Sequence, residues 1–170
     1  MINHYYGRDD IALGAFKGTF GQNIKGVYID DLVDNFDSPV KHYDEVEDAL
    51  TVLRSTLAAA EDNSVVVVSL GFLTNIANLL SSPGDQISQL TGRQLVEQKV
   101  SSVFIMGGVY PATDIFSEFN FNCGEFLLGD LAECEGSAKA AVENMPATVK
   151  MVFSGFEAEL DTPDCIKTNI

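Results

Sequence analysis

Short apolar runs alternate along the chain with stretches in which apolar residues recur every three or four positions. The first run, Val65 to Leu70, is β-branched and ends at a glycine, a pattern typical of a buried strand in a parallel sheet. A second run, Val103 to Met106, ends at Gly107-Gly108, and a third spans Val149 to Phe153. These runs predict three buried strands.

Helical patterns precede and separate the runs. A helix is predicted from Asp44 to about Glu61, another through Asn75–Leu80, and a third from the Thr-x-x-Gln capping box Thr91–Gln94 to about Lys99. A short apolar face, Ala138 to Met145, predicts a fourth helix. The apolar stripe of the first helix consists of Val46, Ala49, Leu50, Leu53, Leu57 and Ala60.

This alternation predicts an α/β fold with a mostly parallel, doubly wound sheet and crossover helices. We expect residues 1–170 to form a single domain, because the chain shows no repeat or linker. In such sheets ligands bind outside the carboxyl ends of the strands. Leu70-Gly71 and Met106-Gly107 are then expected at one edge, which is the expected functional site.

The remaining segments have weaker patterns. Residues 1–40 are rich in glycine and predict loops and short turns, with a short strand between Ile24 and Asp30. The acidic cluster from Asp30 to Asp37 predicts a solvated loop, with a cation site as the alternative. Residues 107–136 have no clear period and predict a long loop, and long loops in compact domains are often functional.

Charge narrows the range of partners. The chain has 10 Lys and Arg against 25 Asp and Glu, a net charge of −15. This balance argues against a nucleic-acid partner and against an anionic membrane surface. No apolar run approaches the roughly 18 residues of a membrane span, and the first residues do not resemble a secretory signal. The compartment stays open between cytoplasmic and secreted.

Cysteine usage leaves two interpretations open. Cys123, Cys134 and Cys165 fit no zinc-site spacing. They are either free thiols or include a Cys123–Cys134 disulfide, which requires an oxidising compartment.

Three motifs occur in order: Gly71-Phe72-Leu73-Thr74-Asn75-Ile76-Ala77, Met106-Gly107-Gly108, and Glu118-Phe119-Asn120. Together they resemble the inosine–uridine-preferring nucleoside hydrolase family, which carries Gly-Pro-Leu-Thr-Asn-Ile-Ala, Met-Gly-Gly and Glu-Phe-Asn. Tyr5–Arg8, Gly14–Gly18 and Val152–Glu157 also look like family segments, so the resemblance covers nearly the whole chain.

The resemblance implies cleavage of the N-glycosidic bond of purine and pyrimidine ribonucleosides, giving ribose and free base. In the family a calcium ion held largely by aspartates activates the attacking water. By position, Glu118 and Asn120 would bind ribose hydroxyls, Met106 would line the sugar pocket, and Leu70 would offer its backbone carbonyl to the metal. The structural alternatives are a plain loop at Glu118–Asn120 and a core role for Met106. Thr74 and Asn75 suit the start of a helix better than ligand binding.

The sequence departs from the family at the metal site. The family signature Asp-x-Asp-x-x-x-Asp-Asp has no counterpart, because Asn3 and Tyr5 stand where aspartates would have to precede Asp9-Asp10. The family's later metal-binding aspartate is expected beyond the stretch that ends soon after Glu157. One backbone carbonyl cannot hold calcium, which needs six to eight oxygens.

We therefore expect an incomplete nucleoside-hydrolase-like domain that binds calcium weakly and turns over little, with its catalytic residues unassigned. The alternatives are a non-catalytic nucleoside or sugar binder and a structural module. A homo-oligomer is expected from the family only.

Overall fold

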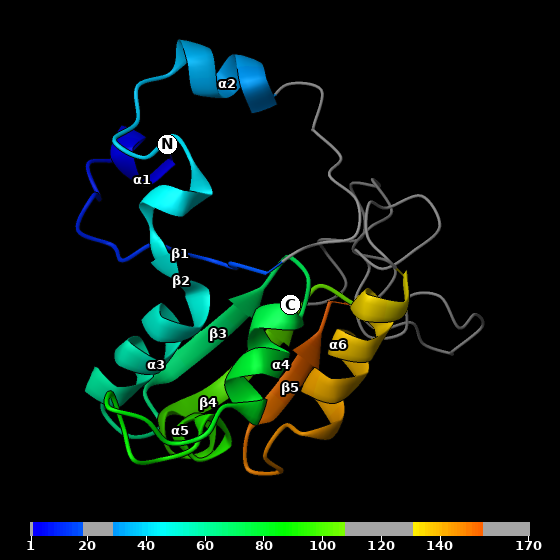
Figure 1. Ribbon diagram of the computed structural model, residues 1–170. Helices are drawn as coiled ribbons and strands as arrows, with labels where there is room; N and C mark the ends of the chain where they lie inside the picture. Colours follow the sequence, from blue (N-terminus) through cyan, green and yellow to red (C-terminus); the bar gives the residue numbers. More distant parts are fainter. Residues whose placement is uncertain (1, 19–28, 108–130, 155–170) are drawn as a thin grey trace, which may run out of the picture.

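The structure, a computed structural model, describes residues 2–18, 29–107 and 131–154 (Figure 1). Its main sheet has three parallel strands in the order β3-β4-β5. The strands are β3 (Val65–Ser69), β4 (Val100–Ile105) and β5 (Lys150–Phe153). All three predicted strands are confirmed, although β4 begins earlier than the apolar run at Val103 indicated.

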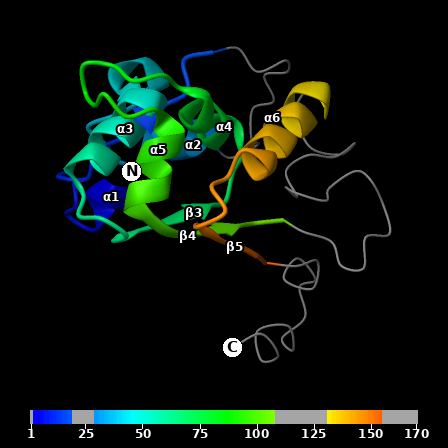
Figure 2. The same cartoon turned by 90° about the horizontal axis from the view of Figure 1, so that it is seen from below.

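Four helices pack on this sheet: α3 (Ala49–Ala59), α4 (Thr74–Ser81), α5 (Gly92–Lys99) and α6 (Leu131–Glu143). They lie on the same side of the sheet (Figure 2). The connections from β3 to β4 and from β4 to β5 step across the sheet in one direction, and right-handed crossovers then place their helices on one face. The described residues thus form an α/β fold with parallel strands.

The helix predicted from Asp44 starts later than expected. Tyr43–Glu45 form a 3-10 turn (η1), and β2 (Glu47–Asp48) pairs in parallel with β1 (Gly14–Ala15) before α3 begins. A Cβ at Gly14 would lie 2.9 Å from the Ala49 Cα, so glycine permits this close approach of β1 to α3. Glu47 and Asp48, which the helical stripe placed in the helix, therefore form a strand with β1 instead.

The prediction of loops over residues 1–40 is wrong at two places. Ile2–Tyr5 form α1, and Ile29–Asn35 form α2, so the acidic cluster lies partly on a helix rather than in a loop. The end of the strand predicted at Ile24–Asp30 is helical as well, and its earlier residues lie outside the described part. At the end of α2, the Phe36 N–H donates a helical bond to the Leu32 carbonyl four residues earlier, and the Asn35 side-chain amide donates to the Asp31 carbonyl.

The predicted long loop 107–136 is also too long, because α6 already begins at Leu131. Residues 131–136 contain good helix formers, but Gly136 interrupts their pattern. The capping box is confirmed: the Thr91 hydroxyl accepts the Gln94 N–H at 3.3 Å, and the Gln94 side chain accepts the Thr91 N–H at 2.9 Å. Among the described residues, no helix has the length and apolar character needed to cross a bilayer.

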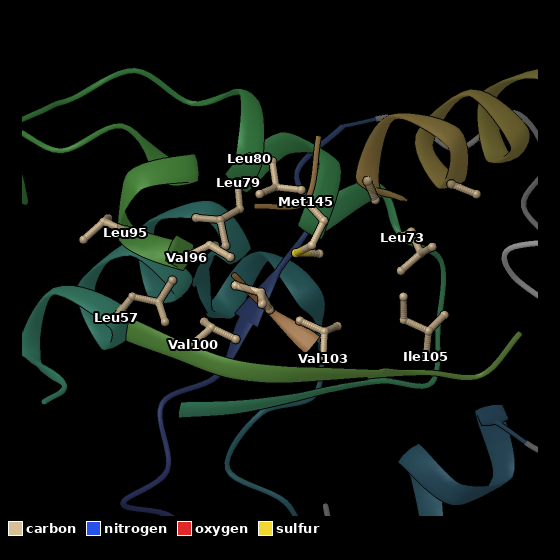
Figure 3. Close-up of a cluster of buried hydrophobic side chains, with 13 residues drawn as sticks. Leu57, Leu73, Leu79, Leu80, Leu95, Val96, Val100, Val103, Ile105 and Met145 are labelled. Atoms are coloured by element: carbon tan, nitrogen blue, oxygen red, sulfur yellow. The ribbon is translucent and has the colours of Figure 1, made fainter. Parts of the chain in front are cut away.

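One core fills the space between the helices and the sheet (Figure 3). Val103 and Ile105 of β4 point into it, each 2% exposed, where Leu73 also lies. The opposite side of the sheet carries Val66, Val68 and Phe104, which are 53%, 62% and 43% exposed. The wholly apolar run at Val65–Leu70 indicated burial on both faces, whereas β3 alternates between a core side and an exposed side. The buried cluster consists of Leu57, Leu73, Leu79, Leu80, Leu95, Val96, Val100, Val103, Ile105, Ala138, Ala141, Met145 and Val149.

Candidate functional site

The carboxyl ends of the three strands meet at one edge. Ser69 pairs in register with Ile105, and Ile105 with Phe153. Beyond the register, the Met106 N–H donates to the Ser69 carbonyl at 3.0 Å. The predicted meeting of Leu70-Gly71 with Met106-Gly107 is therefore confirmed.

Ser154, directly after β5, completes this edge. Its N–H donates to the Ile105 carbonyl at 3.0 Å, and its hydroxyl accepts the Gly107 N–H at 3.3 Å. These two bonds fix the turn after β4, so the backbone that leaves β4 at Gly107 starts from a defined position next to β5.

A cavity of about 460 Å³ opens at the carboxyl end of β3. It lies between β3, the side of α3 and the first turn of α4, with Phe16 and Gly14 also in its wall. None of the described side chains that line it is charged. The apolar part of the wall comes mainly from Val52, Leu53, Val67, Phe72 and Ile76.

Of the side chains that the structure describes, three polar ones also line this cavity: Ser69, Thr74 and Asn75. Ser69 is 9% exposed and Thr74 is 7% exposed. Within the described residues, none of these three side chains makes a hydrogen bond or ion pair. Thr74 and Asn75 do begin α4, as predicted, but Leu73 occupies the N-cap position, and its side chain makes no cap hydrogen bond. The two side chains therefore line the cavity and do not cap the helix, although their residue types suit capping.

A second cavity, of about 370 Å³, adjoins the first at Phe16 and Asn75. Its wall is more polar and includes Lys17, Asp48 and Asn78. The Lys17 ammonium group is already engaged, because it donates to the Tyr43 carbonyl and lies 5.5 Å from the centre of the Tyr43 ring. Within the described ranges, Asn75 is thus the polar side chain that lines both cavities.

The structure describes two of the four site residues predicted from the resemblance, Leu70 and Met106. Leu70 lies on the wall of the first cavity and is 68% exposed. Met106 is half-buried beside Ser69, on the turn after β4. Glu118 and Asn120 lie outside the described residues, as do Cys123 and Cys165 and the side chain of Cys134. The proposed roles of these residues stay predictions.

Asp9 and Asp10 lie in an exposed turn after α1. Asp10 forms an ion pair with Arg8, with an Nε–Oδ1 distance of 2.8 Å, and this hydrogen bond lowers the pKa of Asp10 and raises the pKa of Arg8. Asp9 lies 2.9 Å from the His4 ring nitrogen Nδ1. Both contacts are local, because each joins residues no more than five positions apart in the sequence.

The described residues do not fit a calcium site. They contain no group of three or more His, Cys, Asp or Glu side chains that could hold a metal ion. The Leu70 carbonyl lies in a wall without a described carboxylate, whereas calcium requires several oxygens with charged carboxylates among them. Comparison of the chain with protein-family models, with curated proteins and with solved structures found no match in any of the three.

Proposed function

We propose that the carboxyl edge of the β3-β4-β5 sheet binds a ribonucleoside, in a protein related to the nucleoside hydrolases with their doubly wound fold. The observation that carries the proposal is the bond between the Met106 N–H and the Ser69 carbonyl. It brings together the two strand ends that carry the motifs Gly71–Ala77 and Met106–Gly108. Ligands of parallel α/β sheets bind at this kind of edge.

The cavity beside the edge supports the same proposal. Its volume falls in the range of about 300–1,000 Å³ that is usual for small-molecule sites. Hydroxyl and amide groups set into an apolar wall suit a neutral ligand that carries both ring surface and hydrogen-bonding groups. A ribonucleoside has this character.

Each of the proposed site residues has its own role in binding the ribose. Glu118 would accept hydrogen bonds from ribose hydroxyls, Asn120 would donate and accept them, and Met106 would lie against the sugar. Such contacts position the sugar and hold its ring for bond cleavage. Activation of water needs a further group, which calcium supplies in the family when bound. Because the described residues do not fit that ion, we propose binding with little turnover for this chain.

Calorimetric titration with inosine, uridine and ribose, repeated with added calcium, tests the proposal. We expect saturable nucleoside binding, and Glu118→Gln is expected to weaken it roughly tenfold, because a hydrogen bond to a charged group is lost. Asp9→Asn is the matched control and should leave binding unchanged. Absence of binding by every nucleoside would overturn the proposed function. Calcium-dependent release of ribose from inosine would overturn only the proposal of little turnover.

A further inference from the structure

Two residues of opposite charge, Lys17 and Asp48, line the second cavity, the one of about 370 Å³. They come from neighbouring segments, because Ala15 of β1 pairs with Asp48 of β2 and Lys17 follows two positions after Ala15. The two side chains do not form an ion pair with each other. Among the described residues, no other charged side chain lines this cavity. Its wall therefore carries one positive and one negative group that are not paired together.

The Asp48 carboxylate lacks a partner in the described part of the chain. Asp48 is half-buried and occupies the N-cap position of α3, yet its side chain makes no cap hydrogen bond. It makes no other hydrogen bond or ion pair to a described residue either. A carboxylate that loses part of its hydration without gaining a donor carries a free-energy cost. An ammonium group of a ligand in the cavity would remove that cost.

The Lys17 ammonium group is held in position by Tyr43. It donates to the Tyr43 carbonyl and lies 5.5 Å from the centre of the Tyr43 ring. An ammonium group has three donors, so the bond to this carbonyl leaves two for a ligand. A cation that is fixed in advance loses little conformational freedom when a ligand binds. Lys17 is therefore suited to bind a carboxylate.

One face of α4 supplies neutral polar groups to the same wall. Asn75, Asn78 and Ser81 follow at three-residue spacing, which places them on one side of the helix, and all three line the cavity. The Ser81 hydroxyl donates to the Asn78 carbonyl, whereas the two asparagine side chains make no hydrogen bond to a described residue. Each amide offers donors and an acceptor to a polar ligand.

We infer that this cavity binds a small zwitterion of the α-amino-acid class, with its ammonium group against Asp48 and its carboxylate on Lys17. A ligand with a single charge would meet one wall group of like charge, and an anion is also repelled by the net charge of −15. A zwitterion satisfies both groups without adding net charge. The volume of about 370 Å³ is at the small end of ligand sites, which usually span about 300–1,000 Å³. Lys17 and Asp48 have no role in the proposed function, so the inference goes beyond it.

Titration of the chain with L-serine and L-asparagine, followed by NMR shifts of backbone and asparagine side-chain amides, tests the inference. We expect saturable shifts at Asn75 and Asn78. Asp48→Asn keeps the shape of the side chain but removes its charge, and should weaken L-serine binding about five- to tenfold. Glu47→Gln is the matched control, because it removes the charge of the neighbouring exposed residue of β2 and should have no effect. Thermal unfolding checks that each variant folds.

Two analogues of L-serine separate the contacts. Ethanolamine lacks the carboxylate and β-hydroxypropionate lacks the ammonium group, so each should bind roughly fivefold more weakly than L-serine. Lys17→Met should weaken the binding of L-serine but not of ethanolamine, and Asp48→Asn should weaken the binding of L-serine but not of β-hydroxypropionate. Lys139→Met, at an exposed position of α6, is the control for Lys17→Met and should leave all three ligands unaffected.

Three results would overturn the inference. The first is the absence of saturable binding by both amino acids. The second is an equal effect of Asp48→Asn and Glu47→Gln, because a change in net charge alone would then explain the loss. The third is binding of glycerol as tight as that of L-serine and insensitive to Lys17→Met and Asp48→Asn, which would make the cavity a polyol site. Inosine binding enters none of these results, so the proposed function stands or fails separately.

Discussion

Arg54 and Asp85 form a two-point ion pair between α3 and the loop that joins α4 to α5. The Arg54 Nε lies 2.7 Å from the Asp85 Oδ2, and the Nη2 lies 3.0 Å from the Oδ1. Arg54 is 1% exposed; its Nη1 donates to the Ser82 hydroxyl, and its Nη2 also donates to the carbonyls of Ser88 and Leu90. One buried guanidinium thus fixes both ends of a loop that has no regular structure.

Replacing Arg54 by Met should destabilise the fold by about 3 kcal/mol, because the loop carbonyls and the Ser82 hydroxyl lose their donor inside the protein. Urea unfolding followed by circular dichroism measures the loss. Arg93→Met is the matched control: this arginine is 49% exposed and its pair with Glu97 is 4.0 Å long, so the cost should stay below about 1 kcal/mol. Equal costs for the two variants would contradict the structural role of Arg54.

Asp85 makes part of this stability depend on pH. The hydrogen bond from Arg54, and after it the Ser88 N–H, holds the pKa of Asp85 below its ordinary value of 3.8. A carboxylate whose pKa is lower in the folded chain stabilises the fold fully above the ordinary value. The contribution is lost as the pH falls through the lowered folded value. The stability difference between the native chain and Asp85→Asn should therefore be constant near neutral pH and shrink below about pH 4. A difference that grows on acidification would contradict this sign.

Gly92 and Gly136 should respond in opposite ways to the same substitution. A Cβ at Gly92 would lie 1.7 Å from the Leu79 carbonyl oxygen, so Gly92→Ala has to move backbone and should cost about 3 kcal/mol. At Gly136, within α6, nothing lies within 4 Å of the added carbon. Gly136→Ala should stabilise the fold by about 0.5–1 kcal/mol through helix propensity. Thermal unfolding of both variants checks the pair, and destabilisation by Gly136→Ala would show that α6 packs differently.

The capping box at the start of α5 should make a smaller contribution to the free energy of unfolding. Thr91→Ala removes the acceptor of the Gln94 N–H and should lower the free energy of unfolding by about 1 kcal/mol. Thr91→Ser keeps a hydroxyl at the same position and should recover most of this loss. If both variants behave like the native chain, the first turn of α5 is held by other contacts.

The strands and the capping box could be predicted because their signals are local. An apolar run ended by glycine indicates a strand, and a threonine three residues before a glutamine indicates the start of a helix. Both patterns lie within a few consecutive residues. The meeting of Leu70 and Met106 at one edge followed from the parallel order alone. The helical stripe predicted too long a helix at α3, because Glu47–Asp48 pair with the distant Gly14–Ala15 as a short strand.

The candidate cavity could not be predicted in the same way. The sequence indicates that Thr74 and Asn75 begin a helix, but not that Leu73 takes the N-cap position and leaves both side chains to the cavity. Arg54 is adjacent to Leu53 of the apolar stripe, but its burial depends on Asp85, which only the tertiary fold brings to it. Such contacts depend on packing between elements that no local pattern encodes.

The two sides of β4 provide the last prediction. Ile105 is 2% exposed among the helices, whereas its neighbour Phe104 is 43% exposed on the other face of the sheet. Ile105→Ala should leave a cavity in the core and cost about 3–4 kcal/mol. Phe104→Ala removes more atoms, but 43% of this residue is already exposed to water and its loss opens no enclosed cavity in the core, so its cost should be about half as large, roughly 1.5–2 kcal/mol. Unfolding of both variants in urea measures the costs. A Phe104→Ala cost as large as that of Ile105→Ala would mean that this face of the sheet is covered in solution, by a second copy of the chain or by another part of it, and a dependence of the cost on protein concentration would identify the second copy.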